Sequence, residues 1–157
     1  MSDGFINNLE KIKSKIKDFN IKIKFISLLE KARNEFEQNK YSDCIESCKK
    51  ILAKDSKNST ALRGIGCALQ AMENNEKAIE YYFKALENSK TKEIEYTLIG
   101  TVYYQMDDLD KAIKYFNLAI DANNDYDEAY EGRNQAMLEN HLKIIDLQDS
   151  LIKRNLF

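Results

Sequence analysis

The sequence predicts an all-α solenoid built of antiparallel helix pairs. The chain repeats itself at a fixed interval, because Gly66 aligns with Gly100 and Ala78 with Ala112, 34 positions later in each case. Within each repeat the apolar residues recur three and four positions apart, which is the spacing of one face of an α-helix. Units of constant length suit a stacked array, since added residues would disturb the contacts with both neighbouring units.

The first segment, residues 1–24, is expected to form a basic amphipathic helix. It carries six Lys against three acidic residues, a net charge of +3. An apolar stripe with coiled-coil spacing begins in this segment and runs into the first repeat. The stripe consists of Phe5, Leu9, Ile12, Ile16, Phe19, Ile23 and Ile26. We expect it to pack on the first repeat as an amino-terminal cap. The alternatives are pairing with a second chain and attachment to an anionic membrane surface.

Three repeat units follow, at 25–58, 59–92 and 93–126. Each unit is predicted to hold two helices joined by a short polar turn, so that the helices run antiparallel. Asn74 and Asp108 are equivalent in the repeat and are predicted to cap the second helix of their units. One position in each first helix holds a small residue, which lets two helix backbones approach closely. The small residues are Ala32, Gly66 and Gly100.

The last segment, residues 127–157, is predicted to be a partial fourth unit that serves as a carboxy-terminal capping helix. It departs from the repeat at Asn134, where Gly is expected, and at Asp146, where the second helix needs Ala. A repeat array needs an end piece with a polar outer face, because its last unit would otherwise expose a packing surface. The apolar residues available to pack are Leu142, Ile145 and Leu151.

The repeat resembles the tetratricopeptide repeat, whose 34-residue unit carries Leu-Gly, Ala, an aromatic residue and Ala at set intervals. The second unit supplies Leu62, Ile65, Gly66, Leu69, Ala78, Tyr82 and Ala85, and the third supplies Tyr96, Ile99, Gly100, Tyr103, Ala112, Phe116 and Ala119. The first unit departs from the pattern at Lys31 and Glu35, and its first helix is expected to be shifted by a residue. The resemblance implies a right-handed superhelix that acts as a non-enzymatic protein interaction scaffold.

In the family that the chain resembles, the first helices of the units line a concave groove that binds a peptide or helix of a partner protein. The resemblance therefore implies a partner-binding site by position alone. Its expected residues are Leu29, Arg33, Phe36, Arg63, Cys67, Gln70, Thr97, Thr101, Tyr104 and Gln135.

One subfamily binds the carboxy-terminal Glu-Glu-Val-Asp tail of heat-shock chaperones through Lys, Asn and Arg side chains on three inner helices. The corresponding positions here hold Leu29 and Arg33, then Gly64, then Ile94 and Leu98. This set does not form the carboxylate clamp, so the expected partner is not a chaperone tail. A more apolar or helical ligand is favoured.

The residues do not favour catalysis, a metal site or a cofactor. His141 is the only histidine and lies near the end of the terminal segment. Cys44 and Cys48 are one helical turn apart, but the next unit has Ala78 and Tyr82 at these positions, so core packing explains both thiols better than metal binding does. No enzymatic activity is expected.

Charge and hydropathy exclude further classes of function. The net charge of −2 produces no overall electrostatic attraction for the phosphates of nucleic acid, so nucleic-acid binding is not expected. The longest apolar run is three residues, far short of the roughly 20 that span a bilayer. The amino terminus has no basic and apolar targeting pattern, and the three cysteines are expected to be reduced, so a cytoplasmic location is predicted. The alternative to an adaptor is a self-associating structural protein, a homo-oligomer joined through the Phe5–Ile26 stripe or the Leu142–Phe157 tail.

Overall fold

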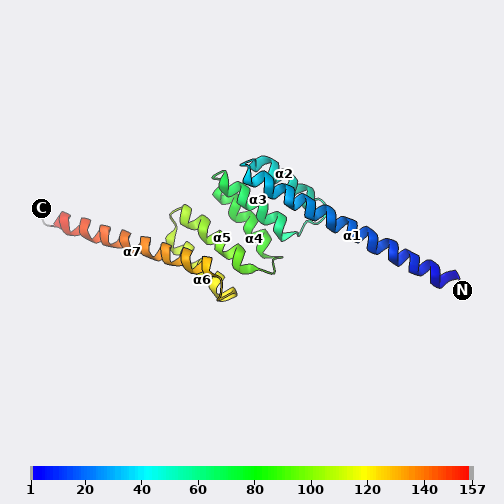
Figure 1. The fold of residues 1–157 in the computed structure, drawn as a ribbon. Coiled ribbons are helices and arrows are strands. Elements are labelled where there is room, and N and C mark those ends of the chain that lie inside the picture. The colour runs from blue at the N-terminus through cyan, green and yellow to red at the C-terminus, as the bar shows by residue number, and fades with distance from the viewer. Residues whose placement is uncertain (1, 156–157) are drawn as a thin grey trace.

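The computed structural model describes the backbone of residues 2–155 and the side chains of residues 10–152 and 154. This part of the chain contains seven helices and no strand, which confirms the predicted all-α solenoid (Figure 1). The helices are α1 (Ser2–Glu37), α2 (Tyr41–Leu52), α3 (Ser59–Ala71), α4 (Asn75–Leu86), α5 (Lys92–Gln105), α6 (Leu109–Ala122) and α7 (Asp127–Asn155). Phe157 lies outside the described residues.

Each helix packs mainly on its neighbours in the chain. The pairs α1–α2, α3–α4 and α5–α6 form the repeat units, and α2–α3 and α4–α5 contacts join one unit to the next. The helix α7 packs on both α5 and α6, in the place that the first helix of a fourth unit would take. This pattern of local contacts is typical of a solenoid.

Glycines on the first helices allow close contact with an aromatic ring on a second helix. A Cβ added at Gly66 would lie 2.5 Å from Cε1 of Tyr82, and one added at Gly100 would lie 3.0 Å from Cδ1 of Phe116. The predicted role of both glycines in packing is therefore confirmed. Gly132 of α7 contacts the same Phe116 ring, with a distance of 2.5 Å from its added Cβ to Cε1. This third contact was not predicted from the sequence.

The core is divided into clusters that follow the helix pairs. Cys44, Cys48 and Ile51 of α2 are buried against α1 and α3, which confirms that the two thiols are core residues. Tyr82 is fully buried in the next cluster, and Phe116 in the last. No single large core forms, because each unit contacts only the units beside it.

The turn inside each pair repeats an uncommon backbone conformation. Asn39, Glu73 and Asp107 are 34 positions apart and have φ angles of 59°, 59° and 65°, in the left-handed region. Asn tolerates this region better than other residues with a side chain, whereas Glu has no such advantage. Because the same positive φ recurs at Asn39, the α1–α2 turn is equivalent to the α3–α4 and α5–α6 turns.

The predicted helix caps are confirmed at one position and wrong at the other. The Asp108 side chain accepts a hydrogen bond from the backbone N–H of Lys111 at 3.2 Å, as expected for a cap of α6. Asn74 makes no such bond at the start of α4. The side chain of Asn58, by contrast, accepts a bond from the N–H of Ala61 and caps α3.

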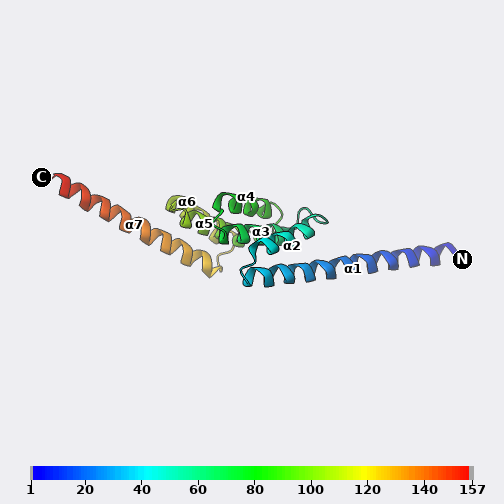
Figure 2. The same ribbon diagram turned by 90° about the horizontal axis from the view of Figure 1, so that it is seen from above.

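The two terminal helices extend beyond the repeats. The helix α1 continues without a break from Ser2 into the first unit, and Figures 1 and 2 show its amino-terminal part leaving the solenoid at one end while α7 leaves at the other. The expectation that the amino-terminal stripe caps the first repeat is wrong, because Ile12, Ile16, Phe19, Ile23 and Ile26 are exposed. A continuous helix cannot fold back onto the unit that it enters. The side chains of Phe5 and Leu9 lie outside the described residues.

The helix α7 covers the last pair with only its first half. Ala129 and Ala136 are fully buried there, whereas Leu142, Ile145 and Leu151 are exposed instead of packing on the solenoid. Within residues 2–155, no helix is both long and apolar enough to cross a membrane.

We predict that Gly66→Ala destabilises the protein although Ala favours helices by about 1 kcal/mol. The new Cβ would overlap the Tyr82 ring, and overpacking of this kind costs about 1–3 kcal/mol. Urea unfolding followed by circular dichroism measures the change. The double variant with Tyr82→Leu is expected to recover part of the loss caused by Gly66→Ala. A Gly66→Ala protein more stable than the parent would contradict the close contact.

We predict that Glu73→Gly stabilises the protein by about 0.5–1 kcal/mol, because Gly adopts positive φ without steric strain. Thermal unfolding is the measurement. The matched control is Glu80→Gly in the middle of α4, where the same change is expected to destabilise by about 1 kcal/mol. Equal effects at the two positions would argue against strain at Glu73.

Candidate protein-interaction groove

The residues expected to bind a partner lie on four helices, and the structure brings half of them together. Leu29, Arg33 and Phe36 of α1 and Arg63 and Cys67 of α3 line one pocket of about 370 Å³. The other lining residues are Ala32, Cys44, Cys48, Thr60 and Gly64. Gln70, Thr97, Thr101, Tyr104 and Gln135 do not line this pocket and lie farther along the first helices.

The pocket combines an apolar floor with a charged rim. Ala32, Cys44 and Cys48 are buried at its base, and Arg33 and Thr60 are exposed. Arg33 forms no ion pair with any side chain in the described part of the protein, so its guanidinium is available at the surface. Such a site can hold an apolar side chain and place a negative group beside it.

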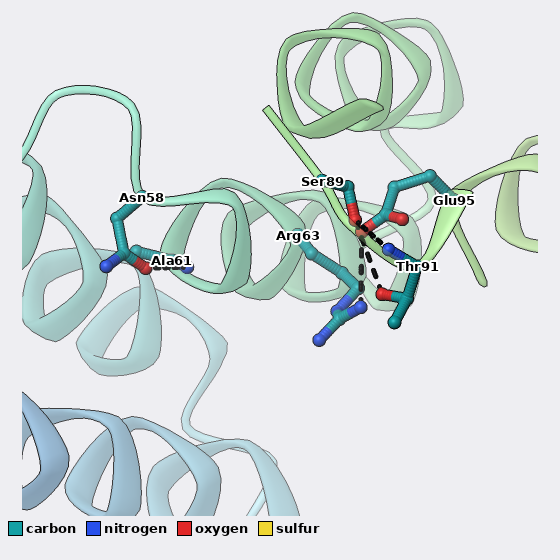
Figure 3. A network of polar contacts seen from close by, with 6 residues as sticks. All are labelled: Asn58, Ala61, Arg63, Ser89, Thr91 and Glu95. Atoms are coloured by element: carbon teal, nitrogen blue, oxygen red, sulfur yellow. Dashed lines mark hydrogen bonds and ion pairs between the residues drawn. The ribbon is translucent and has the colours of Figure 1, made fainter. Parts of the chain in front are cut away.

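Arg63 forms an ion pair within the protein, with Glu95, which was not predicted from the sequence. Its Nη1 lies 3.1 Å from Oε1 of Glu95 on α5, and Glu95 is fully buried (Figure 3). The other carboxylate oxygen of Glu95 has no hydrogen-bond partner among the described residues. A buried carboxylate that loses its only cation is strongly destabilising. Arg63 therefore holds α3 to α5 and is a poor position at which to test binding.

Hydrogen bonds also join the first helices farther along the groove. Gln70 on α3 donates from Nε2 to Oε1 of Gln105 on α5 at 2.9 Å and accepts a bond from the Tyr82 hydroxyl at 2.7 Å. Tyr104 on α5 donates to Oε2 of Glu139 on α7 at 2.6 Å. This bond to a carboxylate raises the pKa of Tyr104, because the tyrosine must keep its proton to donate. The Gln70–Gln105 and Tyr104–Glu139 bonds fix the spacing of neighbouring first helices.

The remaining expected residues differ in their availability. Thr101 donates its hydroxyl to the backbone carbonyl of Thr97 at 2.9 Å. The hydroxyl of Thr97 is buried and has no partner among the described residues. Gln135 on α7 is exposed. Of these three residues, only Gln135 therefore has an exposed polar side chain, and its amide can form hydrogen bonds with a ligand.

Phe36 contributes to the pocket and to the core at once. It is half-buried against the first core cluster, and its ring centroid lies 5.3 Å from that of Tyr41 in an edge-to-face arrangement. A charge at this position would disturb the contact between α1 and α2. Arg33, which is exposed, is the better position at which to change the pocket without unfolding it.

The thiols of the pocket are protonated at neutral pH. Burial raises the pKa values of Cys44 and Cys67 and raises the pKa of Cys48 to about 12. Protonated thiols are weak nucleophiles and weak metal ligands. Within the described residues, no three His, Cys, Asp or Glu side chains are grouped so that they could hold a metal ion.

Comparison with known proteins identifies the repeat. Residues 64–92 and 96–130 match the family model named tetratricopeptide repeat. The chain contains tetratricopeptide repeats. The matched residues do not include the first helix pair. In that pair, Lys31 and Glu35 depart from the repeat pattern. Glu35 accepts a hydrogen bond from Ser47 of α2 at 2.6 Å and pairs with Lys31 at 3.6 Å, so a polar contact replaces an apolar one in this unit.

Solved structures share the fold of this tetratricopeptide repeat protein at low sequence identity. The first such domain of human RPAP3 is 18% identical with a TM-score of 0.69, over 76% of this chain and 94% of that one. The first domain of Spaghetti (RPAP3), bound to the HSP90 peptide SRMEEVD, is 19% identical with a TM-score of 0.67, over 75% and 94% of the two chains. The Sgt2 domain from Aspergillus fumigatus is 18% identical with a TM-score of 0.68, over 74% and 79%. No sequence among the curated proteins matches the chain.

We predict that the free energy of unfolding falls between pH 9 and about pH 12, partly because of Cys48. Unfolded, this thiol loses its proton near its usual pKa of 9.0, whereas the folded protein retains it to about pH 12. The unfolded state is therefore favoured as the pH rises through this range, by up to about 1.4 kcal/mol per pH unit for one thiol. Urea unfolding at a series of pH values measures the slope. The slope is expected to be smaller in Cys48→Ala, and parallel curves for the two proteins would refute the contribution of Cys48.

Proposed function

We propose that this tetratricopeptide repeat protein is a non-enzymatic adaptor that binds a peptide or helix of a partner protein in its groove. The observation that carries the proposal is the pocket between α1 and α3, which is lined by five residues expected to bind. Its volume of about 370 Å³ is at the lower end of the range of ligand pockets. The pocket would act as the anchor point of the interaction.

The chemistry of the pocket favours a ligand with an apolar residue next to an acidic one. Leu29, Phe36 and Cys67 supply apolar contacts, and an anchor residue buried among them would provide most of the binding energy. Arg33 at the rim has no ion pair of its own in the described protein and is free to bind a carboxylate. Arg63 is already paired with Glu95, so its contribution to a ligand would be smaller.

We propose that the rest of the ligand follows the first helices past Gln70, Thr97, Thr101, Tyr104 and Gln135. Gln135 is exposed and would offer hydrogen bonds to a peptide backbone. Tyr104 is half-buried and would present the face of its ring, since its hydroxyl is bonded to Glu139. The location that goes with this role is the cytoplasm, where free thiols such as Cys44, Cys48 and Cys67 persist.

The ligand differs in our proposal from the peptide of a structural relative. Spaghetti is bound to the HSP90 peptide SRMEEVD, which ends in acidic residues. At the positions that would clamp such a tail, this chain has Leu29, Gly64, Ile94 and Leu98, none of which can form an ion pair. Arg33 alone supplies positive charge there. We therefore expect SRMEEVD to bind much more weakly than peptides selected for this pocket, because its carboxy-terminal carboxylates have no clamp here, although its Met and Val each lie beside an acidic residue.

Selection from a displayed library of random peptides tests the proposed function. Peptides enriched on the parent protein are expected to carry an apolar residue close to Asp or Glu. Their affinity, measured by fluorescence anisotropy, should fall by about 10-fold or more in Arg33→Glu, because a charge-assisted contact becomes a repulsive one.

Two controls separate this loss from general effects. Lys54→Glu makes the same change of charge at an exposed position that does not line the pocket, and it is expected to leave affinity unchanged. Arg33→Lys keeps the charge and is expected to bind nearly as well as the parent. If no peptide is enriched, or if the enriched peptides bind Arg33→Glu as well as the parent, the groove proposal is wrong.

A further inference from the structure

Two helical segments extend from opposite ends of the solenoid with no covering element in the described protein. They are the part of α1 before Phe25 and the part of α7 after Asn140, which among the described residues is bonded to the solenoid through Lys143 and Asp107 (Figures 1 and 2). Both carry large apolar side chains that are exposed. Apolar surface of this extent on an isolated helix indicates an interaction site.

The stripe on α1 faces away from the repeats. Its described residues, Ile12, Ile16, Phe19, Ile23 and Ile26, are between 47% and 62% exposed. At 3.6 residues per turn they lie roughly 140° around the helix from the α1 residues that pack on the first core cluster. Those residues are Phe25, Leu28, Leu29, Ala32 and Phe36. The stripe is therefore directed at a partner and not at its own solenoid.

Lysines border the α1 stripe on both sides. Lys11, Lys15 and Lys22 lie beside one edge and Lys13 beside the other, whereas Lys17 and Lys24 lie farther around the helix; all of them are exposed. Two copies of this helix packed on each other would bring these lysines together. Like charges beside a coiled-coil seam oppose pairing, so the α1 stripe is a poor partner for itself.

The exposed part of α7 presents a stripe with the same spacing and with two carboxylates in or beside it. Leu138, Leu142, Ile145 and Ile152 are between 40% and 62% exposed, and Asp149 occupies the remaining place in the alternation of four and three. Asp146 lies beside the stripe and is exposed. Counted over residues 138–155, to the end of α7, three acidic residues are balanced by three basic ones, whereas residues 10–26 carry six lysines against two carboxylates.

We propose that the α1 stripe of one copy packs against the α7 stripe of a second copy. The matched spacing lets apolar side chains interleave along one seam. Asp146 and Asp149 would meet the α1 lysines there, whereas pairing α1 with α1 would bring lysines together. The two extensions leave the solenoid in opposite directions (Figure 1), so a two-fold axis places α7 of each copy beside α1 of the other. The contact is then made twice, and a dimer closes the assembly.

Two double variants test the pairing without changing charge. Ile16→Gln with Phe19→Gln removes the centre of the α1 stripe, and Leu142→Gln with Ile145→Gln removes the centre of the α7 stripe. All four positions are exposed, so the helices of the solenoid should be retained. Sedimentation velocity of the full chain over a range of concentrations is expected to show a dimer for the parent. Each double variant should associate on the order of 100-fold more weakly, because two apolar side chains no longer leave water at each seam.

Mixing the two double variants identifies which surfaces meet. One retains the α7 stripe and the other retains the α1 stripe, so an equimolar mixture is expected to associate through one intact seam, more weakly than the parent but at concentrations where each variant alone stays monomeric. A dimer formed by the α7 variant alone would mean that α1 pairs with α1, and a dimer formed by the α1 variant alone would mean that α7 pairs with α7. Either result overturns the proposal.

Matched controls and salt complete the test. Ile21→Gln and Ile144→Gln change exposed isoleucines on the same helices but outside the two stripes, and the dimer is expected to persist in both. Raising NaCl to about 1 M should weaken the dimer, because it screens attraction between opposite charges. Stronger association at high salt would overturn the pairing, as would a parent chain that stays monomeric at about 100 µM. A monomer that instead sediments with phosphatidylserine vesicles would assign the α1 stripe to a membrane surface. Because Arg33→Glu leaves both stripes intact, it is expected to leave the dimer intact, so this test is independent of groove binding.

Discussion

The distance between the two helices of a unit sets the geometry of the whole array. At Gly66 and Gly100 the absence of a side chain lets the aromatic rings of Tyr82 and Phe116 lie against the backbone of the first helix. Phe116 has a second glycine, Gly132, on its other side, so the same ring also positions α7. Each unit contacts only its neighbours, so a change in one helix spacing would displace every later first helix. The groove depends on these contacts although none of the three glycines lines the pocket.

Polar bonds between first helices add a second constraint on the groove. Arg63 with Glu95, Gln70 with Gln105 and Tyr104 with Glu139 each join one first helix to the next. Residues that make such bonds are held in place and have little capacity left for a ligand. Arg33 has no equivalent bond within the described protein, and it borders the pocket between α1 and α3. This difference separates residues that shape the groove from the residue best placed to recognise a partner.

The terminal helices are longer than the repeats require. The first unit uses α1 only from about Phe25 onward, and the last pair uses α7 only as far as about Asn140. The continuation of each helix costs little, because helix formation propagates once a packed turn has nucleated it. The result is two exposed stripes on helical extensions of the solenoid. The groove and the extensions are separate surfaces, so the proposed partner binding and the proposed pairing do not compete for the same residues.

The class of fold, the number of helix pairs and the packing role of Gly66 and Gly100 could be predicted from the sequence, because these features follow from a periodicity that is visible along the chain. The sequence also indicated the burial of Cys44 and Cys48, since equivalent positions in a repeat share an environment. Only the tertiary structure showed the burial of Glu95 against Arg63, because this pairing depends on the distance between two helices and a lone Glu in a helix looks like a surface residue. The same reason applies to the amino-terminal stripe. Its spacing predicted an amphipathic helix, but only the continuity of α1 into the first repeat decided that the stripe faces away from the solenoid.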